Sequence, residues 1–236
     1  MTGTLQLVFS TPPARIEEAA FHEWYDFHLT EILASRGFLA ARRFAVRPVT
    51  GSEPPAGFRH LSAYETEGSP EELGAALREQ LPAMRLPEWF GEIRFASWNC
   101  FPLDGLAEPS LVEHAYLVFS RPPAGTSFEE LSRWYEDHVA ENLQVAGLVA
   151  GRRFRVEEAR PRGDAGSAIG EAPAPRHLAL YEAAEPIEEV RAALARATAE
   201  GGIAPPDWFP RISFTSLDCV ALSGRVVAAE VRRAPE

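Results

Sequence analysis

One predicted helical segment carries a histidine flanked by groups that could support proton transfer. Trp24, His28 and Glu31 stand at i, i+4 and i+7 with Tyr25 beside them, so a helix places the imidazole between an aromatic wall and a carboxylate. The carboxylate can orient the ring and raise its basicity. A histidine, whose ordinary pKa is roughly 6.5, suits acid–base work near neutral pH. We expect His28 and Glu31 to be catalytic and the two aromatic residues to contact a substrate.

The pattern recurs later in the chain, where a second aromatic pair precedes a second histidine. The later group consists of Trp134, Tyr135, His138 and Glu141. His138 is the second candidate base, and Trp134 and Tyr135 are the matching substrate contacts. The alternative for both copies is structural: each histidine binds a loop carbonyl and holds its helix to the sheet, with the tryptophans in the core.

A second pair of candidate groups lies on a predicted strand. His60, Ser62 and Tyr64 share one face by the two-residue period, opposite Leu61. If the leucine lies under the helices, His60 and Tyr64 point into a barrel interior, where they could remove a proton and steady an enolate. The alternative is that these polar groups satisfy each other across the interface between the two copies. The later copy offers the equivalent residues His177 and Tyr181.

Two tryptophans and two arginines complete the candidate site. Trp89 and Trp208 each precede a predicted final strand, where a tryptophan closes a pocket or, more commonly, packs as a staple on its own half. Arg43 and Arg153 each belong to an Arg-Arg pair on a strand. An inward arginine would bind a carboxylate or enolate, although pairing with Glu31 or Glu141 is the simpler expectation. The residue types predict no metal site.

The chain is an internal duplication. Residues 115–156 align on residues 5–46 without a gap, and 18 of the 42 positions are identical. The similarity continues with insertions to the last predicted strand of each copy. Two copies of about 110 residues indicate two fused domains and not a solenoid, whose units are shorter and more numerous. We place the boundary near residue 108, giving a first half of residues 1–108 and a second half of residues 109–236.

Each half reads as strand, helix, strand, strand, helix, strand. In the first half we expect strands at 5–9, 38–46, 59–65 and 92–101 and helices at about 16–35 and 70–84. This order is typical of a ferredoxin-like unit, whose sheet has helices on one face only. The predicted fold is therefore α+β: two tandem ferredoxin-like βαββαβ units packed sheet to sheet as an intramolecular dimeric α/β barrel.

Composition excludes several classes of partner. The chain has 236 residues, 46% of them apolar, and a formal net charge of -11 with scattered basic residues. Such a charge repels phosphate backbones and anionic lipid, so we expect neither nucleic acid nor membrane as a partner. No basic leader or long apolar run is present, which favours a cytoplasmic chain. The two cysteines, Cys100 and Cys219, occupy matched positions and are expected to be buried thiols.

The segment WYDFHLTEILASRGFLAARRF, followed by RHLSAYE, resembles the EthD-like branch of the dimeric α/β-barrel superfamily. The resemblance extends over both halves, with Leu148 in place of Phe38. It implies the barrel fold. Its implication for the reaction is broad, because such proteins include cyclases, isomerases, cofactor-independent oxygenases, haem proteins and members without known activity.

The resemblance, together with these residues, implies an enzyme that needs no cofactor. The expected reaction is an isomerase, cyclase or lyase type of proton abstraction on a small carbonyl or aromatic, polyketide-like compound. The first half keeps more polar and aromatic groups and is the expected active half. The competing hypotheses are a non-catalytic ligand-binding or structural protein and, less favoured, a haem-binding barrel. A monomer and a homodimer are both compatible with the sequence, because fusion already supplies the interface between the copies.

Overall fold

The computed structural model describes residues 3–49, 57–104, 112–158, 176–201 and 205–233. The first half contains β1 (Thr4–Thr11), α1 (Glu18–Ala34), β2 (Phe38–Pro48), β3 (His60–Thr66), α2 (Pro70–Gln80) and β4 (Arg94–Pro102). The second contains β5 (His114–Arg121), α3 (Phe128–Asn142), β6 (Leu148–Glu158), β7 (Arg176–Ala183), α4 (Ile187–Ala199) and β8 (Ser213–Ala221), followed by β9 (Val226–Val227) and α5 (Ala228–Val231). The predicted order is confirmed in both halves.

Local sequence signals set the ends of several helices. Ser69 caps α2 by accepting a hydrogen bond from the Glu72 amide at 3.2 Å, while the Glu72 carboxylate accepts from the Ser69 amide at 2.7 Å. After α1 the chain turns through Gly37, which has a φ of 88°. A Cβ there would lie 2.9 Å from the Glu67 carbonyl oxygen, and the positive φ strains other residues, so this connection favours glycine.

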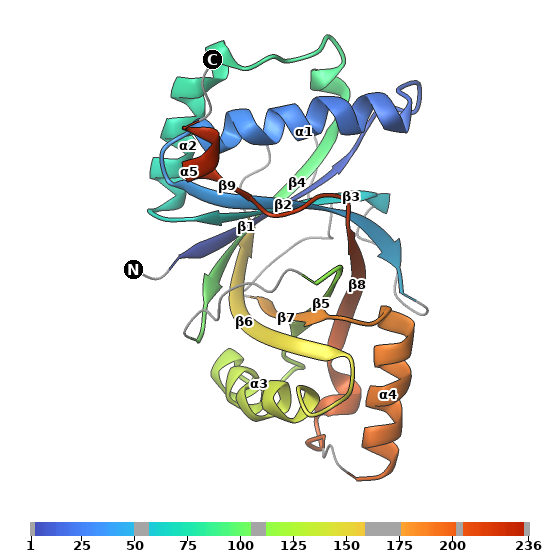
Figure 1. Ribbon diagram of the computed structural model, residues 1–236. Coiled ribbons are helices and arrows are strands. Elements are labelled where there is room, and N and C mark those ends of the chain that lie inside the picture. The colour runs from blue at the N-terminus through green and yellow to red at the C-terminus, as the bar shows by residue number, and fades with distance from the viewer. Residues whose placement is uncertain (1–2, 50–56, 105–111, 159–175, 202–204, 234–236) are drawn as a thin grey trace.

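Eight antiparallel strands close into a barrel. The pairing runs β4-β1-β3-β2 in the first half and β8-β5-β7-β6 in the second. The halves join edge to edge, through β2 with β8 and β4 with β6. Figure 1 shows α1 and α2 on one side of the strands and α3 and α4 on the other. Closure of the barrel creates two regions that side chains must fill. One is the barrel interior, and the other is the layer between the strands and the helices.

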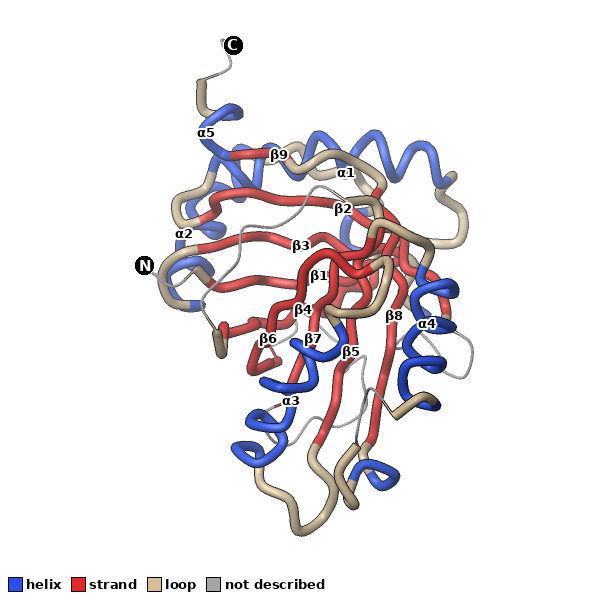
Figure 2. Tube along the Cα trace, turned by 60° about the horizontal axis from the view of Figure 1, so that its bottom comes forward, coloured by secondary structure: helices blue, strands red, loops and turns tan. Residues whose placement is uncertain are grey.

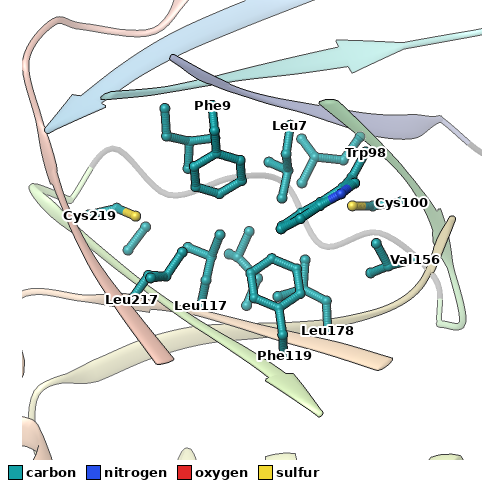
Figure 3. Packing of buried hydrophobic residues seen from close by; sticks show 14 of the residues in the cluster. Leu7, Phe9, Trp98, Cys100, Leu117, Phe119, Val156, Leu178, Leu217 and Cys219 are labelled. Atoms are coloured by element: carbon teal, nitrogen blue, oxygen red, sulfur yellow. The ribbon is translucent and has the colours of Figure 1, made fainter. Parts of the chain in front are cut away.

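The barrel interior is packed with apolar side chains from both halves. Leu7 and Phe9 of β1 meet Leu117 and Phe119 of β5 there, with Trp98 between them (Figure 3). The described interior retains a cavity of about 40 Å³ at the end of the barrel near Arg42 and Arg152. A space of that size holds one or two water molecules, so the interior is a core and not a ligand site.

This packing reverses the predicted orientation of β3 and β7. Leu61 and Leu178 point into the barrel, whereas Tyr64 and Tyr181 pack with the helices. The prediction that the histidines and tyrosines of these strands face the barrel interior was wrong. Both faces of a closed, helix-covered barrel are buried, so alternation of residue types shows which residues share a face but not which face lies inside.

Cys100 and Cys219 are both buried in the barrel core as free thiols, as predicted. The boundary at residue 108 lies outside the described residues. Among the described helices none is long and apolar enough to cross a membrane.

The chain ends by returning from the second half to the first. β9 pairs antiparallel with β2 at Ala40 and Ala41, and α5 packs against α1 (Figure 2). Arg225 pairs with both carboxylate oxygens of Glu65, at 2.7 and 2.6 Å, and Arg232 donates to the carbonyls of Ser35 and Phe38. These contacts cover the end of α1 and tie the two halves together beyond the barrel strands.

We predict that Leu178→Ala lowers the free energy of unfolding by about 2–5 kcal/mol, because it opens a cavity in the barrel interior. Leu222, which is 42% exposed, provides the control. Leu222→Ala should change the same quantity by less than about 0.5 kcal/mol. Urea unfolding followed by circular dichroism measures both, and equal small losses would show that Leu178 does not lie in a packed core.

Candidate active site

A cavity in the second half is larger than the one at the end of the barrel. It has a volume of about 250 Å³ and is bounded by strands β5, β7 and β8 and by helices α3 and α4. Six of its lining residues are aromatic or histidine: Tyr116, Tyr135, His138, Tyr181, Phe209 and Phe214. The cavity thus forms in the layer between strands and helices, and it brings together three predicted site residues, Tyr135, His138 and Tyr181.

A short chain of hydrogen bonds crosses the wall of this cavity. The Asn142 amide Nδ2 lies 3.2 Å from His138 Nε2 and donates to the Tyr181 hydroxyl at 2.9 Å. His138 Nδ1 lies 3.5 Å from a Glu141 carboxylate oxygen. The carboxylate favours a proton on Nδ1, so Nε2 carries the lone pair and accepts from Asn142.

Burial sets the protonation of the two titratable groups. It lowers the pKa of His138 below its ordinary value, although Glu141 opposes the shift. It also raises the pKa of Tyr181, with Asn142 opposing. At neutral pH His138 is therefore a neutral imidazole and Tyr181 is a protonated phenol, which is the pairing of base and hydrogen-bond donor that proton abstraction requires.

The predicted tryptophans lie behind the histidines. Trp134 stacks on His138 with 4.2 Å between ring centroids, and Trp208 meets Trp134 edge-on at 5.3 Å. In the first half Trp24 stacks on His28 at 4.7 Å and meets Trp89 edge-on at 5.1 Å. The tryptophans fix the imidazole planes, and Trp89 and Trp208 pack as staples on their own halves.

In the first half the matching residues are tied to one another. His28 Nδ1 lies 3.1 Å from Glu31, as the helical spacing predicted, and the second oxygen of Glu31 accepts from the Arg85 amide at 2.6 Å. The Trp24 indole donates to the Arg85 carbonyl at 3.0 Å. Glu31 is 9% exposed, whereas the Glu141 side chain is 40% exposed. Glu31 and the Arg85 backbone thus hold His28 and Trp24 in place, although His28 binds the Glu31 carboxylate and not the loop carbonyl of the structural alternative. The 250 Å³ cavity does not lie in the half that the sequence favoured.

The strand histidines lie away from the helix histidines. His60 contacts the first turns of α1, with its Nε2 2.7 Å from Glu18 and its ring edge-on to His22. His177 stacks on Tyr135 at 4.0 Å but does not line the cavity. His28 and His60 therefore do not form one site.

Glu18, His22 and His60 place three ligand-type atoms within 4.8 Å of one another. The surrounding bonds fit a cation poorly. Arg43 Nη2 lies 2.9 Å from His22 Nδ1. In a metal-bound histidine, the ring nitrogen that does not bind the metal carries a proton and needs an acceptor as its partner. The guanidinium of Arg43 is a donor and does not meet that need. Arg59 pairs with Glu18 at 3.1 Å. The two guanidinium groups already supply the positive charge.

The predicted substrate-binding arginines are structural. Arg43 is 1% exposed and bonds Asp26 and the His22 carbonyl of α1. Arg153 binds both carboxylate oxygens of Asp104. The predicted pairing with Glu31 or Glu141 was therefore wrong. Each arginine lies under the first part of the helix that covers its strand, whereas those glutamates lie near the end of that helix.

No family model matches the chain, and no curated protein matches its sequence. A candidate monooxygenase from Fusobacterium nucleatum is similar in structure, with a TM-score of 0.52, 7% identity and 95% of each chain covered. An anthrone oxidase-like protein has a TM-score of 0.53 and 12% identity, covering 100% of this chain and 97% of that one. A candidate chlorite dismutase has a TM-score of 0.55 and 12% identity, covering 98% of each.

These three structures belong to the dimeric α/β-barrel superfamily. The chain has the dimeric α/β-barrel fold. The similarity covers nearly the whole chain, so the barrel includes both halves and not one alone.

Sequence reasoning missed Asn142, a polar residue that links His138 to Tyr181 in this barrel. The gapless alignment of the halves places Asn142 opposite Ile32. A change from apolar to polar one helical turn after the histidine was the available signal. Most of the remaining lining residues are ordinary apolar positions, which only the folded chain brings together.

Two buried histidines make this barrel sensitive to acid. Burial lowers the pKa of His60 to about 4 and that of His177 to about 3. Both values are below the unfolded value of roughly 6.5, so protonation favours the unfolded chain. Their contribution to stability is complete above roughly pH 6.5 and declines as the pH falls toward the folded values.

We predict that His177→Phe reduces the loss of unfolding free energy between pH 6.5 and 4.5 by on the order of 2 kcal/mol, because it removes one of these groups while keeping a ring against Tyr135. Urea unfolding of both proteins at the two pH values measures the difference. An unchanged loss in the variant would show that His177 is not buried in its neutral form.

Proposed function

We propose that the chain is a cofactor-independent enzyme that abstracts a proton from a small carbonyl or aromatic compound bound in the cavity of the second half. The observation that carries this proposal is the His138–Asn142–Tyr181 arrangement in the wall of an otherwise largely aromatic and apolar cavity, with Glu141 beside His138 Nδ1. The reaction class is that of an isomerase, cyclase or lyase.

The cavity supports a small substrate. Its volume of about 250 Å³ lies below the range of roughly 300–1,000 Å³ of sites for drug-sized ligands. Phe209 and Phe214 offer ring surfaces to a flat molecule. A haem macrocycle is larger than a drug-sized ligand, so the haem alternative is less well supported by this cavity.

His138 is the proposed base and Tyr181 the proposed hydrogen-bond donor. For the base to act, its 3.2 Å contact with Asn142 must open so that Nε2 reaches a substrate C–H. The proton moves from carbon to Nε2, and Glu141 stabilises the imidazolium that forms. The Tyr181 O–H donates to the substrate oxygen, where the negative charge of the enolate develops.

The structural neighbours support an enzyme-like role. All three are described by the name of an enzyme class, a candidate monooxygenase, an anthrone oxidase-like protein and a candidate chlorite dismutase. Identities of 7% and 12% carry no reaction over to this chain. The competing function is a non-catalytic binding protein, which would use the same cavity without the proton transfer.

The finer features of the fold also belong to this proposal. We assign each half as a ferredoxin-like unit, supported by the equivalent strand orders β4-β1-β3-β2 and β8-β5-β7-β6. The EthD-like relationship rests on the sequence motifs of α1 and α3. In this assignment the two duplicated units form their shared interface within one chain.

The test measures exchange of carbon-bound hydrogen for deuterium. Small cyclic ketones such as 2-tetralone are incubated with the protein in D2O at neutral pH and followed by proton NMR. The expected result is accelerated exchange next to the carbonyl, reduced by about 10²-fold or more in His138→Ala because the base is lost. His28→Ala, the same change at the matched position of the first half, should retain the rate.

Equal loss in both variants would contradict the assignment of the active half. Binding without exchange in the unmodified protein would favour the competing function. Circular dichroism of each variant establishes that it is folded before its rate is compared.

A further inference from the structure

Asn142 leaves one buried acceptor without a partner. Its amide nitrogen bonds His138 and Tyr181, while its carbonyl oxygen Oδ1 has no hydrogen-bond partner among the described residues. The residue is 5% exposed and lines the cavity. A buried acceptor without a partner costs about 1–3 kcal/mol, and the matched Ile32 of the first half avoids that cost.

The Asn142 amide nitrogen faces two acceptors. It lies 3.2 Å from His138 Nε2, which accepts when the proton of the neutral imidazole lies on Nδ1, the nitrogen nearer to Glu141 at 3.5 Å. The Tyr181 oxygen accepts from the same nitrogen, which leaves the Tyr181 hydrogen available for donation. The wall of the cavity therefore carries an acceptor, Asn142 Oδ1, and a donor, the Tyr181 O–H, on neighbouring side chains.

We infer that Asn142 makes this site specific for a hydroxyl group on an aromatic or enolic ligand. A hydroxyl is both donor and acceptor, so it satisfies Asn142 Oδ1 and the Tyr181 O–H together. A ketone or an ether accepts from Tyr181 but has no hydrogen for Asn142. The inference rests on the proposed function and deepens it, because the enolate becomes an enol, with a hydroxyl, when the His138 imidazolium returns the proton taken from carbon to the enolate oxygen.

Matched bicyclic ligands test the inference through quenching of tryptophan fluorescence. Wild-type protein is titrated with 2-naphthol, 2-methoxynaphthalene and naphthalene. The account predicts that 2-naphthol binds at least about 10-fold more tightly than its methyl ether, because the ether cannot donate. This comparison needs no variant and so does not depend on the folding of one.

Variants then test whether Asn142 causes the preference for naphthol over its methyl ether. Asn142→Ile, which installs the residue of the first half, should remove the difference between naphthol and ether while retaining naphthalene binding. Ile32→Ala is the matched control and should leave the preference unchanged. Tyr181→Phe removes only a hydroxyl and should weaken naphthol binding, which provides a second variant of minimal size.

The possible failures are distinct. Equal binding of naphthol and ether by the wild-type protein overturns the role of Asn142 but leaves the cavity and the exchange reaction standing. A preference that survives Asn142→Ile in a folded protein also overturns it. Failure of all three ligands to bind overturns this inference together with the proposed use of the cavity.

Discussion

Closure of the barrel through β2 with β8 and β4 with β6 is the constraint on which the rest of the structure depends. Once the edge strands are paired, the interior is a sealed space that apolar residues from both halves fill. His60, Tyr64 and Tyr181 of these strands then face the helices. The candidate site therefore forms in the layer between strands and helices.

Duplication provides two such layers, and they have diverged. In the first, Glu31 bridges His28 to the Arg85 backbone, and the C-terminal β9 and α5 cover the end of α1. In the second, Glu141 is more exposed and Asn142 replaces an isoleucine beside the cavity. Buried polar atoms without a hydrogen-bond partner occur in both halves of the described chain, and among them Asn142 Oδ1 belongs to a residue that lines the larger cavity. Unsatisfied buried groups are costly, so their retention favours a role in binding.

Much of the fold was predictable because it depends on local signals. Periodicity, Pro-Pro turns and the repeat itself set the order of elements, and Gly37 marks the end of α1. The orientation of β3 was not predictable, since Leu61 and Tyr64 are both buried and residue type does not tell the barrel side from the helix side. The stacking of tryptophan on histidine and the His28–Glu31 contact followed from helical spacing. Asn142 and the partners of Arg43 depended on contacts between elements distant in the sequence.

The most direct test of a ligand site under α3 is the NMR response of the six histidine rings to a bound aromatic ligand. Proton–carbon correlation spectra of the imidazoles, assigned by single substitutions, are recorded while 2-naphthol is added. The account predicts that the His138 signal shifts in a saturable manner and that the His28 and His60 signals stay in place. A saturable shift of His28 or His60 with His138 unchanged would contradict the central claim and place the site in the first half.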